Sequence, residues 1–222
     1  TNLLSGTRAI SWPDSNSAYA YLSFFFRGEY NYKELYYAEV AARTDASSRF
    51  GKDHRWGMFW SLGFMWNIKN EAFLKDIEWL TNAQIKLSTG TSGNSEIPYY
   101  DHLALVAGDA NYNDEAGIYP KQSGNEELSW EQTWANNIGL TLGIFNRVNL
   151  NVDFYHKKTT NRLMLVPQSY AITGVGNRWD NIGAMMNRGV EIAMDGDVIR
   201  TKDFTWNLSA NVSYNKNKLL EL

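Results

Sequence analysis

Residues 204–215 read FTWNLSANVSYN, and this stretch decides the fold. Apolar and polar side chains alternate with period two, which predicts a β-strand because successive side chains of a strand point to opposite faces. The polar face consists only of Thr, Asn and Ser. A strand with an apolar face for lipid and a small, hydrogen-bonding face for water is typical of the wall of an outer-membrane β-barrel. The apolar face is made by Phe204, Trp206, Leu208, Ala210, Val212 and Tyr214.

The same alternation elsewhere predicts an all-β, antiparallel up-and-down transmembrane β-barrel wall of about eight strands. No run approaches the roughly 18 apolar residues that a transmembrane helix needs. Residues 73–80 have helical spacing and predict a short helical link between the third and fourth strands. The predicted strands cover residues 21–32, 35–44, 56–68, 82–91, 134–144, 148–159, 182–194 and 204–216.

The connections between these strands alternate in length. Short ones are expected at 33–34, 73–80, 145–147 and 195–203, the last opened by the polar turn sequence Asp195-Gly196-Asp197. Longer ones are expected at 45–55, 92–133 and 160–181. Short periplasmic turns and long extracellular loops give this alternation in outer-membrane barrels, whereas the Greek-key crossings of a β-sandwich would disturb it.

Aromatic residues are abundant, at 14% of the 222 residues, with 9 Trp and 13 Tyr. Rings with an apolar body and a polar tip suit a membrane interface. Aromatic side chains flank the short connections, as an interfacial girdle requires. These are Tyr30, Tyr32, Tyr36, Tyr37, Trp66, Phe73, Trp79, Phe204 and Trp206.

Nothing in the sequence indicates catalysis or a bound metal. His54, His102 and His156 lack metal-ligand spacing, and Glu126-Glu127 lies in a long connection without signs of buried acid–base chemistry. The chain has no cysteine, and its net charge of −3 argues against a nucleic-acid partner. We therefore expect no enzyme, no cofactor and no metal site.

The long connections hold the candidate ligand contacts. Aromatic faces there can stack on sugar rings or peptide side chains, or can equally pack loop against loop. The candidates are Tyr99, Tyr100, Tyr112, Tyr119, Trp130, Tyr170 and Trp179.

Several short motifs follow one another in an order that resembles the SusC/RagA-type TonB-linked (TonB-dependent) outer-membrane receptors. Each motif is weak alone, but together they extend over most of the chain. They are RTDASSRFG (43–51) with RWG (55–57), KLSTGTSGN (86–94), LSWEQT (128–133), VDFYHKKT (152–159), NIG (181–183) with NRGVE (187–191), and SYNKNK (213–218).

The resemblance implies a 22-stranded barrel in the bacterial outer membrane that imports glycans, oligosaccharides or peptides. It also implies a SusD-like surface lipoprotein that acts as a lid, an N-terminal plug, and contact with the TonB complex through an N-terminal segment. No plug, TonB-contacting segment or C-terminal strand of that family is recognisable here. We therefore expect residues 1–222 to be part of one receptor β-barrel domain, an internal segment of a longer chain.

Two other interpretations remain open at this stage. The first is a soluble antiparallel β-sandwich that binds carbohydrate through surface aromatics, which would be monodisperse without detergent. The second is a small, complete eight-stranded barrel, which the strand number allows. The long connection at 92–133 makes the second alternative the weaker one.

Overall fold

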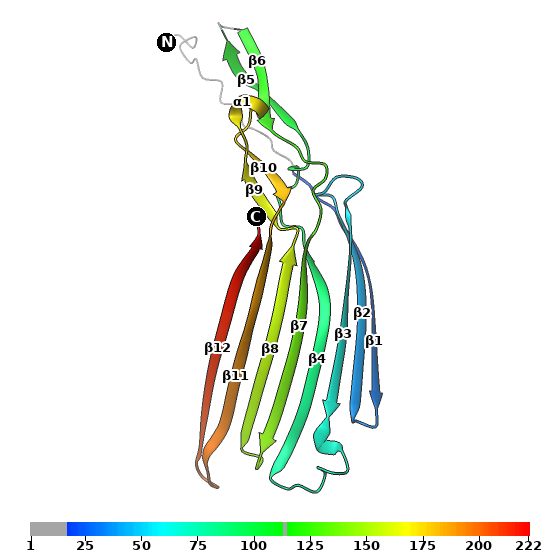
Figure 1. Cartoon of the computed structure of the whole chain (residues 1–222), viewed down its shortest axis with the longest axis vertical. Helices are drawn as coiled ribbons and strands as arrows, with labels where there is room; N and C mark the ends of the chain where they lie inside the picture. The colour runs from blue at the N-terminus through cyan, green and yellow to red at the C-terminus, as the bar shows by residue number, and fades with distance from the viewer. Residues whose placement is uncertain (1–16, 113–114) are drawn as a thin grey trace, which may run out of the picture.

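One large antiparallel sheet forms most of the molecule (Figure 1). The computed structural model describes residues 17–112 and 115–222, without the side chains of residues 109–112 and 116. In the described part of the chain, no helix is long and apolar enough to cross a membrane. The strands of the sheet, in spatial order, are β1 (Tyr21–Tyr32), β2 (Tyr36–Ser47), β3 (Trp56–Asn67), β4 (Leu80–Asn94), β7 (Glu131–Ile144), β8 (Val148–Thr160), β11 (Ala184–Arg200) and β12 (Thr205–Glu221).

The eight predicted strands are confirmed. Each pairs with the strand that precedes it in the sheet, always antiparallel. This up-and-down order differs from the Greek-key order of a β-sandwich, and the sheet is single and open rather than closed on itself. Several strands extend beyond their predicted ends, most of all β11 and β12, with 17 residues each.

Two small hairpins occupy the long connections, where the sequence predicted only loops. One pairs β5 (Leu105–Tyr112) with β6 (Glu115–Gln122), and the other pairs β9 (Leu163–Pro167) with β10 (Asn177–Asn181). A four-residue helix, α1 (Tyr170–Thr173), lies between β9 and β10. Both hairpins lie beyond the upper end of the large sheet (Figure 1).

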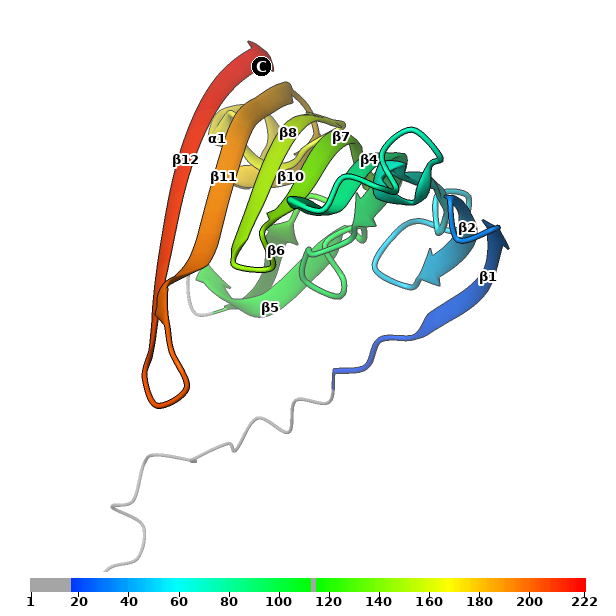
Figure 2. The same ribbon diagram turned by 90° about the horizontal axis from the view of Figure 1, so that it is seen from below.

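The large sheet curves into an open arc when it is seen from below (Figure 2). The β5–β6 hairpin lies on the concave side of that arc. All the short connections lie at the lower end, and the connections that carry the hairpins lie at the upper end (Figure 1). The predicted alternation of connection lengths is therefore confirmed for the tight turns and the hairpin-bearing connections, whereas the lower connection at 68–79 is longer than the upper one at 48–55.

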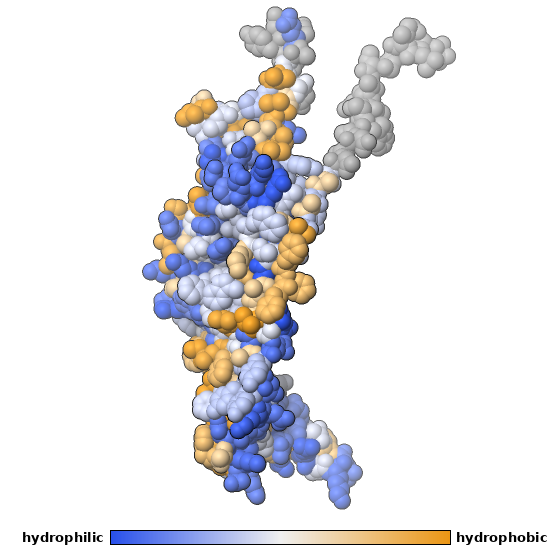
Figure 3. Space-filling model, turned by 90° about the vertical axis from the view of Figure 1, so that its right-hand side faces the viewer, coloured by the Kyte–Doolittle hydropathy of each residue, from blue (hydrophilic) through white to orange (hydrophobic). Residues whose placement is uncertain are grey.

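One face of the sheet is apolar, as the strand register shows. A row of directly opposed residues runs across five strands: Ile85, Leu140, Val152, Ile192 and Val212. Many large apolar side chains on this outward face stay exposed, among them Met58 at 69% and Val212 at 68%. Figure 3, a view onto the β1 side, shows hydrophobic residues along the strands and hydrophilic ones towards both ends. A soluble monomer rarely leaves so large an apolar patch in water, whereas a lipid-facing barrel wall requires it.

The other face is polar and hydrogen-bonded across strands. Asn137 donates to the Ser88 hydroxyl at 3.1 Å, and the Thr141 hydroxyl donates to Asn151 at 2.8 Å. We call this the inward face, because its member Phe59 packs against Trp130 of the upper connection. The two faces together make the chain part of the wall of a larger transmembrane β-barrel.

The predicted helical link at 73–80 is wrong. This segment consists of turns, and the nearby helix is a single 3-10 turn at Ile68–Asn70. Its two aromatic residues are exposed, Phe73 at 67% and Trp79 at 50%, so a helix here would gain little from packing them. The Lys69 ammonium organises the segment instead, donating to the carbonyls of Leu74, Lys75 and Ile77 at 2.9, 3.0 and 2.7 Å.

The predicted turn at Asp195-Gly196-Asp197 is also wrong, because these residues lie within β11. Asp195 accepts a hydrogen bond from Asn149 at 2.9 Å, and Asp197 accepts one from Asn207 at 3.3 Å. Their carboxylates therefore belong to the inward face, and a bulge follows between Asp197 and Ile199. The actual connection is shorter, at 201–204.

Aromatic side chains gather at the lower end of the outward face, as predicted for a girdle. Tyr30 is 66% and Phe204 58% exposed. The hydroxyl of Tyr36 and the indole of Trp66 both donate to the Glu71 carboxylate, at 2.6 and 3.0 Å, so their polar tips point towards the connection. Tyr37 differs from the prediction, because its register partner Asn31 places it on the inward face.

Candidate functional site

A hydrophobic cluster ties the upper connections to the sheet. Its members are Phe50, Phe59, Ile97, Leu128 and Trp130, with the partly buried Leu163 and Trp179 packed against it. Trp130 is 5% exposed, and its indole donates to the Arg55 carbonyl at 2.8 Å. Three connections from distant parts of the chain are thus fixed to one another above the inward face.

Strands β3 and β4 separate near this cluster. Their pairing runs only from Asn67 with Gln84 up to Ser61 with Gly90. Above that point the Phe59 ring occupies the space beside Gly93, where a Cβ would overlap the ring. The separation leaves a hollow on the inner wall at the end of the paired region.

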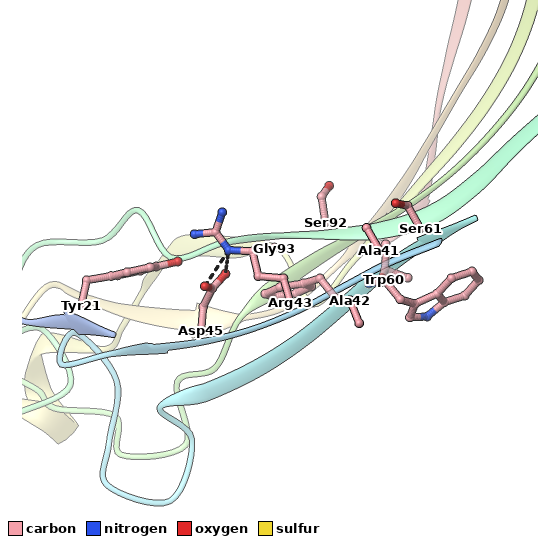
Figure 4. Close-up of a pocket in the computed structure, with 11 residues that line it drawn as sticks. Tyr21, Ala41, Ala42, Arg43, Asp45, Trp60, Ser61, Ser92 and Gly93 are labelled. Atoms are coloured by element: carbon pink, nitrogen blue, oxygen red, sulfur yellow. Dashed lines mark hydrogen bonds and ion pairs between the residues drawn. The ribbon is translucent and has the colours of Figure 1, made fainter. Parts of the chain in front are cut away.

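This hollow, of about 390 Å³, is the candidate functional site (Figure 4). Strands β1 to β4 supply its lining. The Arg43 guanidinium, the Asp45 carboxylate and the Tyr21 hydroxyl point towards one another, while Trp60 points away (Figure 4). The full lining is Tyr21, Ala41, Ala42, Arg43, Asp45, Phe59, Trp60, Ser61, Thr91, Ser92 and Gly93.

Arg43 and Asp45 form the polar centre of the hollow. The Arg43 Nε–H donates to both carboxylate oxygens of Asp45, at 2.7 and 2.8 Å, and an Nη2–H donates to Ser23 at 3.3 Å. Asp45 is only 4% exposed, whereas the Arg43 side chain is 54% exposed. A guanidinium carries five N–H donors in a fixed plane. The buried carboxylate therefore holds the fork in place and leaves further donors for a carbonyl or carboxylate ligand.

A second hollow, of about 440 Å³, adjoins the first and shares Tyr21 and Gly93 with it. The Arg49 guanidinium lies 5.2 Å from the ring centroids of both Tyr19 and Tyr99, and these rings stack at 4.9 Å. Arg49 also donates to the Ser95 carbonyl at 3.0 Å. Cation–π contact and the backbone hydrogen bond hold this arginine in the wall of the second hollow.

The predicted ligand-contacting aromatics fall into two groups in the structure. Trp130 and Trp179 belong to the packed cluster, so little of the Trp130 ring is left for a ligand. The others lie around the upper end of the sheet. Tyr99 borders the second hollow through its contact with Arg49, and Tyr100 is hydrogen-bonded through its hydroxyl to the backbone of Ala18 at 3.0 and 3.2 Å.

The remaining predicted tyrosines lie on the hairpins. Tyr119 of β6 is 40% exposed, and Tyr170 of α1 is 68% exposed. Tyr112 ends β5, and its side chain lies outside the described part of the structure. Neither Tyr119 nor Tyr170 lines the inner-wall hollow.

The connection between β4 and β5 also holds a partly buried carboxyl group, that of Asp101. Burial raises the pKa of Asp101 above its ordinary value, while a hydrogen bond from Trp179 and the neighbouring His102 act in the opposite direction. Another histidine of the upper end, His54, lies 3.1 Å from the Glu127 carboxylate. These are contacts within and between connections, and none reaches the Arg43 hollow.

Sequence reasoning missed the residues that line the hollow, notably Tyr21, Arg43, Asp45 and Ser92. One signal was present: Arg43 and Asp45 are both charged and lie two apart on a strand, so they share a face. The separation of β3 from β4 had no sequence signal.

Comparison with known proteins agrees with this architecture. The family model of the TonB dependent receptor-like β-barrel matches residues 1–219. TonB-dependent receptor P39 of Formosa agariphila is 37% identical over 207 residues, which make up 93% of this chain and 20% of that protein. TonB-dependent receptor SusC of Bacteroides thetaiotaomicron is 36% identical over 213 residues, or 90% of this chain and 21% of that protein.

Solved structures give the same result. The RagAB peptide importer in its closed-closed state superposes with a TM-score of 0.86 at 40% identity, over 92% of this chain and 22% of that chain. The siderophore receptor PirA of Pseudomonas aeruginosa, at 13% identity and a TM-score of 0.63, shares the fold. The chain spans about a fifth of the length of the curated relatives it matches. With its strand order, its two-faced sheet and a family match along nearly its whole length, the chain belongs to the TonB-dependent receptor β-barrels of the SusC/RagA type, which are proteins of the outer membrane.

Proposed function

We propose that this chain forms part of the barrel wall of a TonB-dependent transporter that imports a nutrient across the outer membrane. The observation that carries the proposal is the superposition on the RagAB peptide importer at a TM-score of 0.86 with 40% identity. The lipid-facing and water-facing sides of the sheet support it, because an importer needs both. We assign transport rather than catalysis to the chain.

The partners follow from the same proposal. A SusD-like surface lipoprotein would cover the upper end, where the β5–β6 and β9–β10 hairpins project (Figure 1). Contact with the TonB complex would come through an N-terminal part of the receptor. Residues 1–222 would then be one part of a single barrel domain, with a plug domain and C-terminal strands supplied by the rest of the receptor.

We further propose a peptide as the substrate, in preference to a glycan or oligosaccharide. The polar centre of the inner-wall hollow is a guanidinium held by a buried carboxylate, and such a fork pairs with a carboxylate or carbonyl of a peptide. The Phe59 ring in the same hollow is 6% exposed and packs against Trp130, so this ring offers no open face for a sugar. Tyr21, 44% exposed, is directed by its hydroxyl towards Arg43 and Asp45 (Figure 4). In this proposal Arg43 is the residue that contacts the substrate.

Uptake by cells that carry the full-length receptor tests the proposal. Changing Arg43→Gln together with Asp45→Asn replaces the ion pair by amides of similar size and leaves no unpaired buried carboxylate. Loss of a charge-assisted hydrogen bond of about 1.5–3 kcal/mol predicts an increase of roughly 10- to 150-fold in the peptide concentration for half-maximal uptake. The Arg27→Gln variant is the control, because Arg27 lies on the neighbouring strand and pairs with Glu39 at 3.2 Å, away from the hollow.

Three outcomes separate the levels of the proposal. Impaired uptake of peptides in the double variant but not in the control supports the Arg43 site. Uptake of oligosaccharides in place of peptides would contradict the substrate class. Absence of any TonB-dependent uptake by the full-length wild-type receptor would contradict the transport function itself.

A further inference from the structure

Basic residues gather on the outward face of β8, β11 and β12, immediately above the apolar band. The strand register shows where the change occurs. Phe154, Val190 and Tyr214 form one row of directly opposed residues. The next outward row towards the upper end is His156, Arg188 and Lys216, and the row after that is Lys158, Met186 and Lys218.

These five basic side chains are exposed, and their two rows contain no acidic residue on β8, β11 or β12. His156, Lys158, Arg188, Lys216 and Lys218 are all exposed. Within the described part of the chain, none of these five side chains forms a hydrogen bond or an ion pair with another residue. The acidic residues of β8 and β11 are on the inward face, as the register of Glu191 with Asp153 and of Asp195 with Asn149 shows. The acidic residue of β12, Glu221, ends its strand opposite Ala184.

This arrangement costs free energy within the chain. Directly opposed side chains in an antiparallel pair have Cβ atoms about 4.5–5.5 Å apart, and like charges at that spacing repel. Arg188 lies directly opposite the Lys216 ammonium on β12 and opposite the His156 imidazole on β8. An external anion would offset the repulsion.

The charge is confined to one sector of the wall. In the same two rows, β4 and β7 carry the neutral residues Thr89, Asn136, Thr91 and Trp134. A general preference for basic residues in these rows would have placed charge there too. The patch is therefore a local feature of three adjacent strands.

The position of the patch identifies the chemistry of its occupant. It continues directly from the lipid-facing band, at the end of the strands that carries the hairpins, which is the outer-leaflet side of the membrane. Long Lys and Arg side chains at such a boundary reach from apolar surface to the headgroup level. Basic clusters beside a membrane span bind phosphorylated headgroups.

We propose that His156, Lys158, Arg188, Lys216 and Lys218 form a site for the phosphorylated headgroup of an outer-leaflet lipid, the phosphates of a lipid A-type glycolipid. The acyl chains of the bound lipid lie along the apolar rows below, beside Val190 and Tyr214. Arg188 lies at the centre of the site and binds phosphate through its planar fork. The surrounding lysines add charge, and His156 adds an imidazole N–H donor.

Binding of fluorescent diphosphoryl lipid A to the detergent-solubilised full-length receptor tests this site. Each Lys or Arg near an anionic lipid contributes roughly fivefold in affinity, so Arg188→Gln with Lys216→Gln is expected to weaken binding about 25-fold. Lys157→Gln is the matched control, because Lys157 neighbours Lys158 on β8 and faces inward, over the Tyr155 ring at 5.4 Å. The control is expected to bind like the wild type.

Two further measurements on the wild-type receptor test the site even if the double variant folds poorly. Wild-type receptor is expected to bind dephosphorylated lipid A much more weakly, and inorganic phosphate at millimolar concentration is expected not to displace the lipid. Equal binding of the phosphorylated and dephosphorylated forms would overturn the proposal, as would equal loss in the Lys157→Gln control. Displacement by phosphate alone would show a site for the free anion instead of a lipid. Peptide uptake through the Arg43 hollow is measured separately, so a failure of the proposed transport function would not change the meaning of the lipid-binding result.

Discussion

Placing an arginine on each face of β11 at the same depth tests the orientation of the wall. Ile192 is outward, in the central apolar row between Val152 and Val212, and is 41% exposed in the isolated sheet. An arginine at the bilayer midplane of a barrel costs about 2–4 kcal/mol. Ile192→Arg should therefore lower the folding equilibrium constant of the full-length receptor about 30- to 1,000-fold.

Its neighbour gives the matched control. Ala193 faces inward and is exposed, in the register row of Asn151 and Asn211. An arginine there keeps its water and has acidic neighbours, so Ala193→Arg should cost less than about 1 kcal/mol, the range of lumen-facing and interfacial substitutions.

Folding into liposomes across a urea series measures both changes. A spin label at position 192 should also be reached by a lipid-soluble quencher and one at position 193 by a water-soluble quencher. Equal costs for the two arginines, or a label at 192 that neither quencher reaches, would refute the assignment of the outward face to lipid.

Two further changes test the ends of the sheet. Gly93→Ala places a methyl group into the Phe59 ring and should destabilise the receptor by about 1–3 kcal/mol, measured as a lower urea midpoint. Gly63→Ala is its control, because the added Cβ meets nothing closer than 3.6 Å and the change should be close to neutral. An equal loss of stability in the two variants would contradict the packing argument. Lys69→Met removes the donor to three carbonyls in the lower connection and should speed proteolysis within residues 71–79. Lys75→Met is its control, because only the carbonyl of Lys75 takes part in that network, and equal proteolysis of the two variants would show that Lys69 does not organise the segment.

The large sheet was predictable because its alternation is long. In β12, twelve consecutive residues with one apolar face leave no helical alternative. The hairpin of β9 and β10 was not predictable in the same way, because each strand has five residues. Over so short a run, the apolar sequence of Leu163–Pro167 fits a loop, a helix or a strand equally well. Its pairing with β10 then depends on tertiary contacts.

The two wrong predictions near the short connections have different physical causes. Helical spacing at 73–80 predicted a helix because periodicity assumes a surface on which the apolar stripe can pack, and Phe73 has none. The polar sequence of Asp195 to Asp197 predicted a turn because polar residues usually end a strand. In a barrel wall the inward face is itself polar, so a run with a glycine between two aspartates can continue the strand.

The candidate site shows a different limit of the sequence. Aromatic residues in the long connections were predicted to contact ligand from their residue type, but only the structure shows that Trp130 is used for packing. The Arg43 hollow depends on where β3 and β4 stop pairing, and that point follows from the space taken by the Phe59 ring beside Gly93. Such a separation arises from packing between strands and leaves no periodic signal in either one.

The basic patch illustrates why register carries information that single strands lack. In the sequence, His156, Arg188 and Lys216 lie about thirty residues apart, and each reads as one polar residue within or at the end of an alternating run. Cross-strand pairing turns them into one row, directly above the row of Phe154, Val190 and Tyr214. Because all three strands carry a basic residue in the same row while β4 and β7 carry neutral ones, the apolar boundary alone does not explain the charge. A ligand that is both apolar and anionic explains the charge, because its acyl chains need the apolar lower row and its headgroup needs the basic upper row.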